Sequence, residues 1–292
     1  MINFIQQFIN GLSLGSVYAL IALGYTMVYG IIRLINFAHG DIYMMGAFTS
    51  YFLFSQGQLS IFLVLPLTMI LTALLGGLIE KVAYKPLRQS PRISSLITAI
   101  AVSYLLQNGM TYFVGAETRS YPQVIANEIY RLGAFQISKM QIILIAMSVV
   151  LTIALQFIIQ KTKMGKAMRA VSMDAEAAQL MGINPDTVIT FTFFLGSALA
   201  GAGGLLVGMY YNSITPLMGA SYGNKAFVAA VLGGIGIVPG AVLGGYLIGM
   251  IEVMIAAYGN SMLRDGIVYA LLILILLVRP AGILGKSTVE KV

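Results

Sequence analysis

Few residues of this 292-residue chain could do acid–base or metal chemistry, and three stand out by their surroundings. His39 is the only histidine, and it lies two residues before Asp41 in the run Asn36-Phe37-Ala38-His39-Gly40-Asp41. Glu252 stands alone inside the apolar stretch 246–258. A histidine and carboxylates inside a membrane can line a substrate path or relay protons. We therefore treat these three side chains as candidate functional residues.

Each of them also has a structural interpretation. Asn36 and Asp41 could cap the helix that follows them, and this role can coexist with a place on a substrate path. Glu252 could pair with a buried donor or face a neighbouring subunit. One histidine, no cysteine and ten scattered acids supply no catalytic triad, no catalytic dyad and no metal cluster. The sequence predicts neither an enzyme nor a metal site.

The segment Gly233-Gly234-Ile235-Gly236-Ile237-Val238-Pro239-Gly240 resembles a phosphate-binding loop only superficially. No Lys-Ser or Lys-Thr pair follows its glycines, so it predicts no nucleotide site. Its proline and glycines disfavour a continuous helix, and we expect a turn followed by a helix from about Ala241 to Tyr258. Other glycines are spaced four apart and let helices approach closely: Gly11/Gly15, Gly204/Gly208, Gly236/Gly240/Gly244 and Gly245/Gly249.

The elements that must position these residues are transmembrane helices. Hydrophobic residues make up 59% of the chain and charged residues 9%, and the mean hydropathy is +0.90. A soluble domain carries about a quarter charged residues, so a soluble enzyme, a nucleic-acid-binding domain and a disordered chain are excluded. Several charge-free runs are long enough for a helix of about 20 residues to cross the bilayer, and none alternates as in a β-barrel. We predict an all-α polytopic membrane protein with a single transmembrane domain over residues 1–292.

The positions of the basic residues predict the topology. Lysine and arginine cluster in 81–92, in 161–169 and in 279–291, as is typical of cytoplasmic loops. The net charge of +7 therefore indicates membrane orientation and not a nucleic-acid partner. By parity, 117–139, 212–225 and 259–265 fall outside. The count is about nine crossings, within a range of 8–10 that includes interrupted helices, with the N-terminus outside.

One crossing must be interrupted. Residues 42–54 form an apolar stretch of 13 residues, which as a helix is only about 20 Å long. To cross the membrane it must recruit residues 35–41, so the run 36–41 is expected at or inside the membrane. Irregular backbone at that depth requires shielding by protein or by a water-filled cavity.

The cytoplasmic segment 161–186 predicts a short exposed helix. Met164, Gly165 and Arg169 lie in its first part. Asp174 and Glu176 can open a helical turn, in which acids suit the helix dipole, and Gly182 can end it. The stretch between them contributes small apolar residues, namely Ala175, Ala177 and Leu180. Such a helix could offer its apolar face to a separate cytoplasmic protein. An ordinary interfacial loop is the alternative.

Several motifs in order resemble branched-chain amino acid ABC-transporter permeases, in particular the H-type subunit of the leucine/isoleucine/valine system. The N-terminal motifs are Asn10–Leu12, Tyr18–Tyr25, Tyr29-Gly30 and Ile35–Asp41. The remaining motifs are Glu80–Arg88, Met164–Asn184, Lys225–Gly245 and Leu276–Gly285. The similarity covers nearly the whole chain except about 116–140.

The resemblance implies a permease subunit of an ATP-driven importer that moves leucine, isoleucine and valine across the bacterial cytoplasmic (inner) membrane. It implies a second related permease, two cytoplasmic ATPases that bind the ATP, and an extracytoplasmic solute-binding protein. This chain, embedded in the lipid bilayer, then needs no cofactor of its own and no nucleic acid.

The resemblance also assigns roles to residues. It implies that the helix at 174–182 is the coupling helix, which docks in a groove on the ATPase. The ATPase-coupling residues are then Met164, Gly165, Arg169, Asp174, Ala175, Glu176, Ala177, Leu180 and Gly182. Because paired helix breaks in opposite halves of a chain point to a pathway near the midplane, we expect 36–41 and 233–240 to flank it. The candidate pathway residues are Asn36, His39, Asp41, Glu252, Gly233, Gly234 and Gly236.

Two alternative functions stay open from the sequence. The first is an importer of the same kind for urea, amides or other small polar solutes. The second is an ATP-independent secondary transporter or channel, in which His39, Asp41 and Glu252 form a proton path. That alternative predicts transport by this chain alone and sensitivity to a proton gradient. The importer predicts neither.

Overall fold

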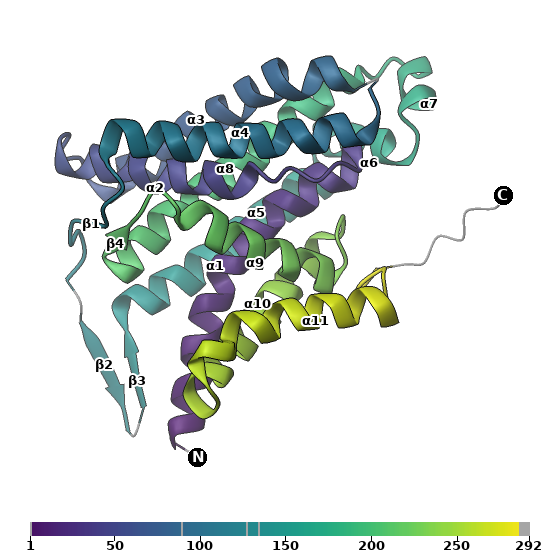
Figure 1. Cartoon of the computed structure of the whole chain (residues 1–292). Helices are drawn as coiled ribbons and strands as arrows, with labels where there is room; N and C mark the ends of the chain where they lie inside the picture. The colour runs from purple at the N-terminus through teal and green to yellow at the C-terminus, as the bar shows by residue number, and fades with distance from the viewer. Residues whose placement is uncertain (1, 89, 127, 134, 286–292) are drawn as a thin grey trace.

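The computed structural model of the chain describes residues 2–88, 90–126, 128–133 and 135–285, and the helices dominate them (Figure 1). In chain order the helices are α1 (Ile2–Ile32), α2 (His39–Ser55), α3 (Ile61–Ile79), α4 (Arg92–Val114), α5 (Lys139–Lys161), α6 (Lys163–Met173), α7 (Ala175–Leu180), α8 (Pro185–Tyr211), α9 (Met218–Gly233), α10 (Val238–Tyr258) and α11 (Arg264–Val278). Short π and 3₁₀ turns follow α3 at Glu80–Tyr84 and Lys85–Leu87, and a 3₁₀ turn at Ser261–Leu263 precedes α11.

The described helices offer up to nine passages across a membrane. Seven helical stretches are long and apolar enough to cross by themselves. The other two passages contain α2 and α9, which have 17 and 16 residues. Each of these short helices follows a non-helical stretch, residues 33–38 before α2 and 212–217 before α9. The interruption before α2 is therefore confirmed, whereas the number of about nine crossings stays a prediction.

The ends of the helices gather on two opposite sides of the bundle. Gln6, near the start of α1, exchanges hydrogen bonds of 3.0 and 2.9 Å with the backbone of Gln136 in the loop 117–139. The start of α1 and this loop therefore share one side. At the other end of α1, Gly30 packs against Gly236. On that second side the basic loop 81–92 meets the start of α8 through Arg88 and Asp186.

The outer loop contains short strands that the sequence analysis did not predict. Strands β2 (Ile129–Leu132) and β3 (Phe135–Ser138) pair as an antiparallel hairpin. Their turn includes Gly133, whose φ of +65° is a conformation that glycine adopts at little cost. Strands β1 (Arg119–Ser120) and β4 (Ser213–Ile214) pair next to it. These strands close the outer side of the bundle and do not change its all-α transmembrane body.

Helix α1 runs obliquely through the bundle in Figure 1, with α3 and α4 on one side of it and α10 and α11 on the other. It crosses α10 through the predicted glycines. A Cβ placed on Gly15 would lie 2.7 Å from the Cα of Tyr246, and one placed on Gly249 would lie 2.2 Å from the backbone nitrogen of Gly15. The two backbones thus touch where neither residue has a side chain, which confirms the packing role of these glycines.

Two predicted boundaries are wrong. Residues 212–225 are not an outer loop, because α9 begins at Met218 and Lys225 is buried within it. The helix after the glycine-rich turn begins at Val238 and not at Ala241. Pro239 lies in its first turn, where a proline is tolerated because the backbone N–H it lacks would have no partner inside the helix.

Candidate functional site

The run 36–41 enters the interior of the protein, as predicted. Arg33 adopts a left-handed backbone conformation with φ of +52°, which ends α1 and turns the chain back toward the bundle. Asn36, His39 and Asp41 are then almost completely buried, with 1–2% of their surface exposed. The shielding protein that irregular backbone needs at this depth is therefore present.

The capping role considered for Asn36 and Asp41 is wrong. The residue at the cap of α2 is Ala38, and no side chain caps this helix. The Oδ1 atom of Asn36 accepts a hydrogen bond of 2.6 Å from the hydroxyl of Tyr84. The Oδ1 atom of Asp41 accepts one of 3.0 Å from the amide of Gln107 in α4. Both polar groups therefore tie the start of α2 to other segments of the protein.

His39 fills a space between two other helices. A Cβ placed on Gly24 of α1 would lie 2.0 Å from His39 Nε2, and one placed on Gly196 of α8 would lie 3.8 Å from the same ring. The ring also meets Tyr25 edge-on, with 4.9 Å between ring centroids. Its Nε2 atom has no hydrogen-bond partner among the described residues. In this conformation His39 acts as a packing residue that holds α2 against α1 and α8.

The break before α2 meets the break before α9. A Cβ placed on Gly40 would lie 2.4 Å from the carbonyl oxygen of Gly219, and one placed on Gly223 would lie 2.8 Å from the Cα of Gly40. The starts of two interrupted helices therefore touch inside the bundle. The signal for the second break is Pro216, which disfavours helix for the residue before it.

The glycine-rich segment 233–240 does not meet the run 36–41. It forms a turn against Gly30 near the end of α1, and Gly234 packs on Ala281 and Gly285. The run 36–41 instead meets the start of α9, at Gly219 and Gly223. That Gly233, Gly234 and Gly236 line a substrate pathway stays a prediction.

Glu252 pairs with a buried cation, which is one of the structural interpretations considered above. Its Oε1 atom lies 2.8 Å from Nζ of Lys225, and its Oε2 atom accepts a 2.6 Å hydrogen bond from the hydroxyl of Tyr18. Arg264 and Asp265, at the start of α11, extend this charged cluster, with Asp265 2.8 Å from Lys225. The sequence analysis missed Lys225 because it placed this residue in a loop.

The first part of the segment 161–186 forms a tight turn between α5 and α6. Thr162 caps α6 by accepting a hydrogen bond of 3.0 Å from the backbone of Gly165. A Cβ on Gly165 would lie 2.2 Å from the carbonyl oxygens of residues 158 and 159, so only glycine fits. Arg169 donates to the carbonyl of Ile159. Gly165 and Arg169 therefore hold the turn, and Met164 is half-buried in it.

The second part of the segment 161–186 is the predicted short helix. Asp174 caps α7 by accepting a hydrogen bond of 2.9 Å from the backbone of Ala177. Gly182, with φ of +82°, follows the end of the helix. Ala175, Glu176, Ala177 and Leu180 are all exposed. Leu180 and the neighbouring Met181 expose 88% and 83% of their surface, so an apolar face points into water.

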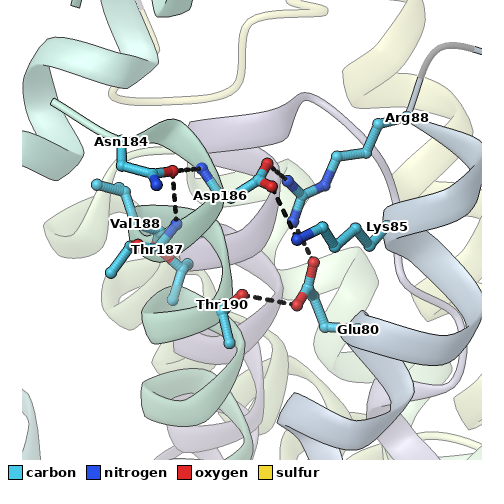
Figure 2. A network of polar contacts seen from close by, with 9 residues as sticks. Glu80, Lys85, Arg88, Asn184, Asp186, Thr187, Val188 and Thr190 are labelled. Carbon is cyan, nitrogen blue, oxygen red and sulfur yellow. Dashed lines mark hydrogen bonds and ion pairs between the residues drawn. The ribbon is translucent and has the colours of Figure 1, made fainter. Parts of the chain in front are cut away.

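An ion network joins the end of this segment to the loop between α3 and α4 (Figure 2). Arg88 contacts both Glu80, in the turn after α3, and Asp186, in the first turn of α8. Lys85 adds a 2.8 Å contact to Asp186, and Thr190 donates a 2.8 Å hydrogen bond to Glu80.

Glu80 is the buried member of this network, and its side chain has 0% of its surface exposed. A buried carboxylate is costly unless a cation and hydrogen bonds compensate it. Because Arg88 supplies that cation while also holding Asp186, the start of α8 cannot move away from α3 without uncovering the charge of Glu80. The network is thus a clamp between the turns after α3 and the start of α8, which follows the exposed helix α7.

These features define a polytopic membrane protein with an exposed helix at one end of its bundle. The chain belongs to the family described as "Branched-chain amino acid transport system / permease component", which matches residues 7–276. It is a transport subunit and a multi-pass membrane protein.

Named relatives match almost the whole chain. It is 42% identical to the high-affinity branched-chain amino acid transport system permease protein LivH of Escherichia coli (strain K12), over 99% of this chain and 98% of that protein. It is 41% identical, with the same coverage, to the corresponding permease protein BraD of Pseudomonas aeruginosa. A probable branched-chain amino acid transport permease of Methanocaldococcus jannaschii is 32% identical over 91% of this chain and 88% of that protein. No solved structure matches the chain.

Proposed function

We propose that this chain is the transmembrane permease subunit of an ATP-driven importer for leucine, isoleucine and valine. In this proposal it works with a second related permease, two cytoplasmic ATPases that bind the ATP, and an extracytoplasmic solute-binding protein. The family and the names of the relatives support the substrate class and the type of machine.

The observation that carries the proposal is the apolar face of α7. Leu180 and Met181 are exposed on a capped helix at the basic, cytoplasmic end of the bundle. Apolar side chains on a short helix that packs on little of its own chain are suited to a groove on another protein. The occupant proposed for this face is the ATPase.

The clamp of Figure 2 explains how docking could drive transport. A movement of α7 passes directly into α8, which begins five residues after α7 ends. Arg88 joins that start of α8 to the buried Glu80, so the turn after α3 must follow. The ATPase would therefore move two transmembrane helices together as rigid elements.

The ATP-independent alternative has less support from the geometry. His39 lies between Gly24 and Gly196, whereas Glu252 is held by Lys225 and Tyr18. The described contacts do not connect these two residues into one chain of hydrogen bonds. An importer for urea or amides would use the same machine, and competition by urea and by amides against leucine uptake separates it from the proposal.

A docking variant tests the proposal. Leu180→Asp should reduce the amount of ATPase that copurifies with the tagged chain at least tenfold, because it places a charge in the docking face. Met262→Asp is the matched control, since Met262 is also 89% exposed but lies next to the outer end of α10. ATPase recovered equally with both variants would refute the docking role of α7.

A further inference from the structure

A cavity of about 320 Å³ lies between α4 and α9, at the point where the two helix breaks meet. It is at the small end of the range for ligand pockets, which is about 300–1,000 Å³, and so suits one small molecule. Ser103, Gln107 and Asn224 are polar residues of its wall, while Phe37, Ile100 and Tyr104 supply apolar or aromatic surface.

The carboxylate of Asp41 lies directly behind this wall. It accepts the hydrogen bond from Gln107, which lines the cavity. A Cβ placed on Gly219, another residue of the wall, would lie 2.6 Å from Asp41 Oδ1. The absence of a side chain at Gly219 therefore lets the carboxylate approach the cavity closely.

Asp41 differs from the other buried acids of the described residues in having no cation. Asp41, Glu80 and Glu252 are all 2% exposed or less. Glu80 pairs with Arg88 and Glu252 with Lys225, but no described lysine or arginine lies within 4 Å of Asp41. A buried carboxylate is expensive without an opposite charge, so this site is suited to a cation that arrives from outside the chain.

The surface beside the cavity is polar where lipid would require apolar side chains. Helix α9 exposes Ser221 and Asn224 on the side of the cavity. Polar side chains inside a membrane face a protein interior or a water-filled path. This face of α9 is therefore suited to a path between this chain and the second permease of the proposed complex.

We propose that the cavity is a transit site for a free amino acid, whose ammonium group lies against Gln107 and Gly219 and is attracted by the charge of Asp41 directly behind them. Gln107 holds the carboxylate of Asp41 in place. Phe37 and Ile100 contact the aliphatic side chain of the substrate. The inference rests on the proposed importer function and specifies its ligand chemistry, a small apolar molecule that carries a protonated amine. A urea or amide substrate would leave the charge of Asp41 unmatched.

The first test is uptake of radiolabelled leucine by the complete complex in proteoliposomes. Uptake by the unchanged complex tests the importer function itself, so a failure there is distinct from a failure of the site. If the unchanged complex transports leucine, Asp41→Asn should reduce uptake at least tenfold, while Asp41→Glu, which keeps the charge, retains at least a third. Equal uptake by Asp41→Asn and the unchanged complex would overturn the site.

The second test does not depend on the folding of an Asp41 variant. The chain has no cysteine, so Ala220→Cys places a single thiol in the wall of the cavity. Leucine should slow maleimide labelling of this thiol in the complex at least threefold, and 4-methylpentanoate, which has the same skeleton without the amine, should not. Ala257→Cys, exposed at the outer end of α10, is the control, and leucine should leave its labelling unchanged. Equal protection by both compounds, or protection by neither, would refute the proposal.

Discussion

Lys225 and Glu252 form an ion pair of 2.8 Å between α9 and α10, and both side chains are almost completely buried. Tyr18 of α1 donates a hydrogen bond to the same carboxylate. The consecutive helices α9 and α10 therefore meet the distant helix α1 at this ion pair. Because each of these groups satisfies another, the cluster fixes where α9 lies, and α9 in turn forms one wall of the proposed transit site.

Removing one partner of this pair should destabilise the protein. Glu252→Gln leaves Lys225 with only Asp265, and breaking a buried pair costs about 3–5 kcal/mol. Since Asp265 stays, we expect the low end, about 3 kcal/mol, measured by denaturant unfolding in detergent. The double variant Glu252→Gln with Lys225→Met should recover most of this loss.

The single and the double variant also separate a structural role of Glu252 from a role in transport. If Glu252 acts only by pairing, the double variant should also regain leucine uptake. A stable double variant that does not transport leucine would instead place Glu252 on the pathway.

The crossing of α1 and α10 should tolerate no side chain. At Gly249 a Cβ would lie 2.2 Å from the backbone of Gly15, so Gly249→Ala must push the helices apart. We expect a lower melting temperature and a lower yield of the purified complex. Gly266→Ala in α11 is the matched control, because a Cβ there meets no atom within 4 Å and alanine favours helix by up to about 1 kcal/mol. Equal melting temperatures for the two variants would contradict this packing.

The two basic residues of the clamp should contribute unequally to the stability of the protein. Arg88→Met leaves the buried Glu80 without its cation, and we expect a loss of about 3–5 kcal/mol in unfolding free energy together with reduced uptake per ATP hydrolysed. Lys85→Met removes a contact in which both side chains are about half exposed, and such pairs contribute about 0–1 kcal/mol. Similar losses for both variants would show that Arg88 has no special role.

Local signals account for what could be predicted from the sequence. Asp174 and Gly182 mark the two ends of α7 by themselves, because capping and a left-handed glycine depend only on neighbouring residues. The apolar runs predicted transmembrane helices because hydropathy, too, is read from neighbouring residues. The prediction that 36–41 lies at or inside the membrane followed from the length of the apolar stretch after it.

Contacts between distant residues could not be predicted in this way. Glu80 and Asp186 share Arg88 although more than 100 residues separate them. Lys225 was assigned to a loop because a charge normally interrupts a transmembrane helix, and only its pairing with Glu252 reveals that it lies inside one. The cavity beside Asp41 likewise exists only because two separate helix breaks meet.

Reconstituted leucine uptake tests the central claim most directly. Proteoliposomes containing this chain, its copurifying permease and the ATPases would be given the solute-binding protein outside and ATP inside. We predict uptake of radiolabelled leucine that requires enclosed ATP, and none when this chain is reconstituted alone. Uptake by this chain alone, driven by a proton gradient and indifferent to ATP, would contradict the account.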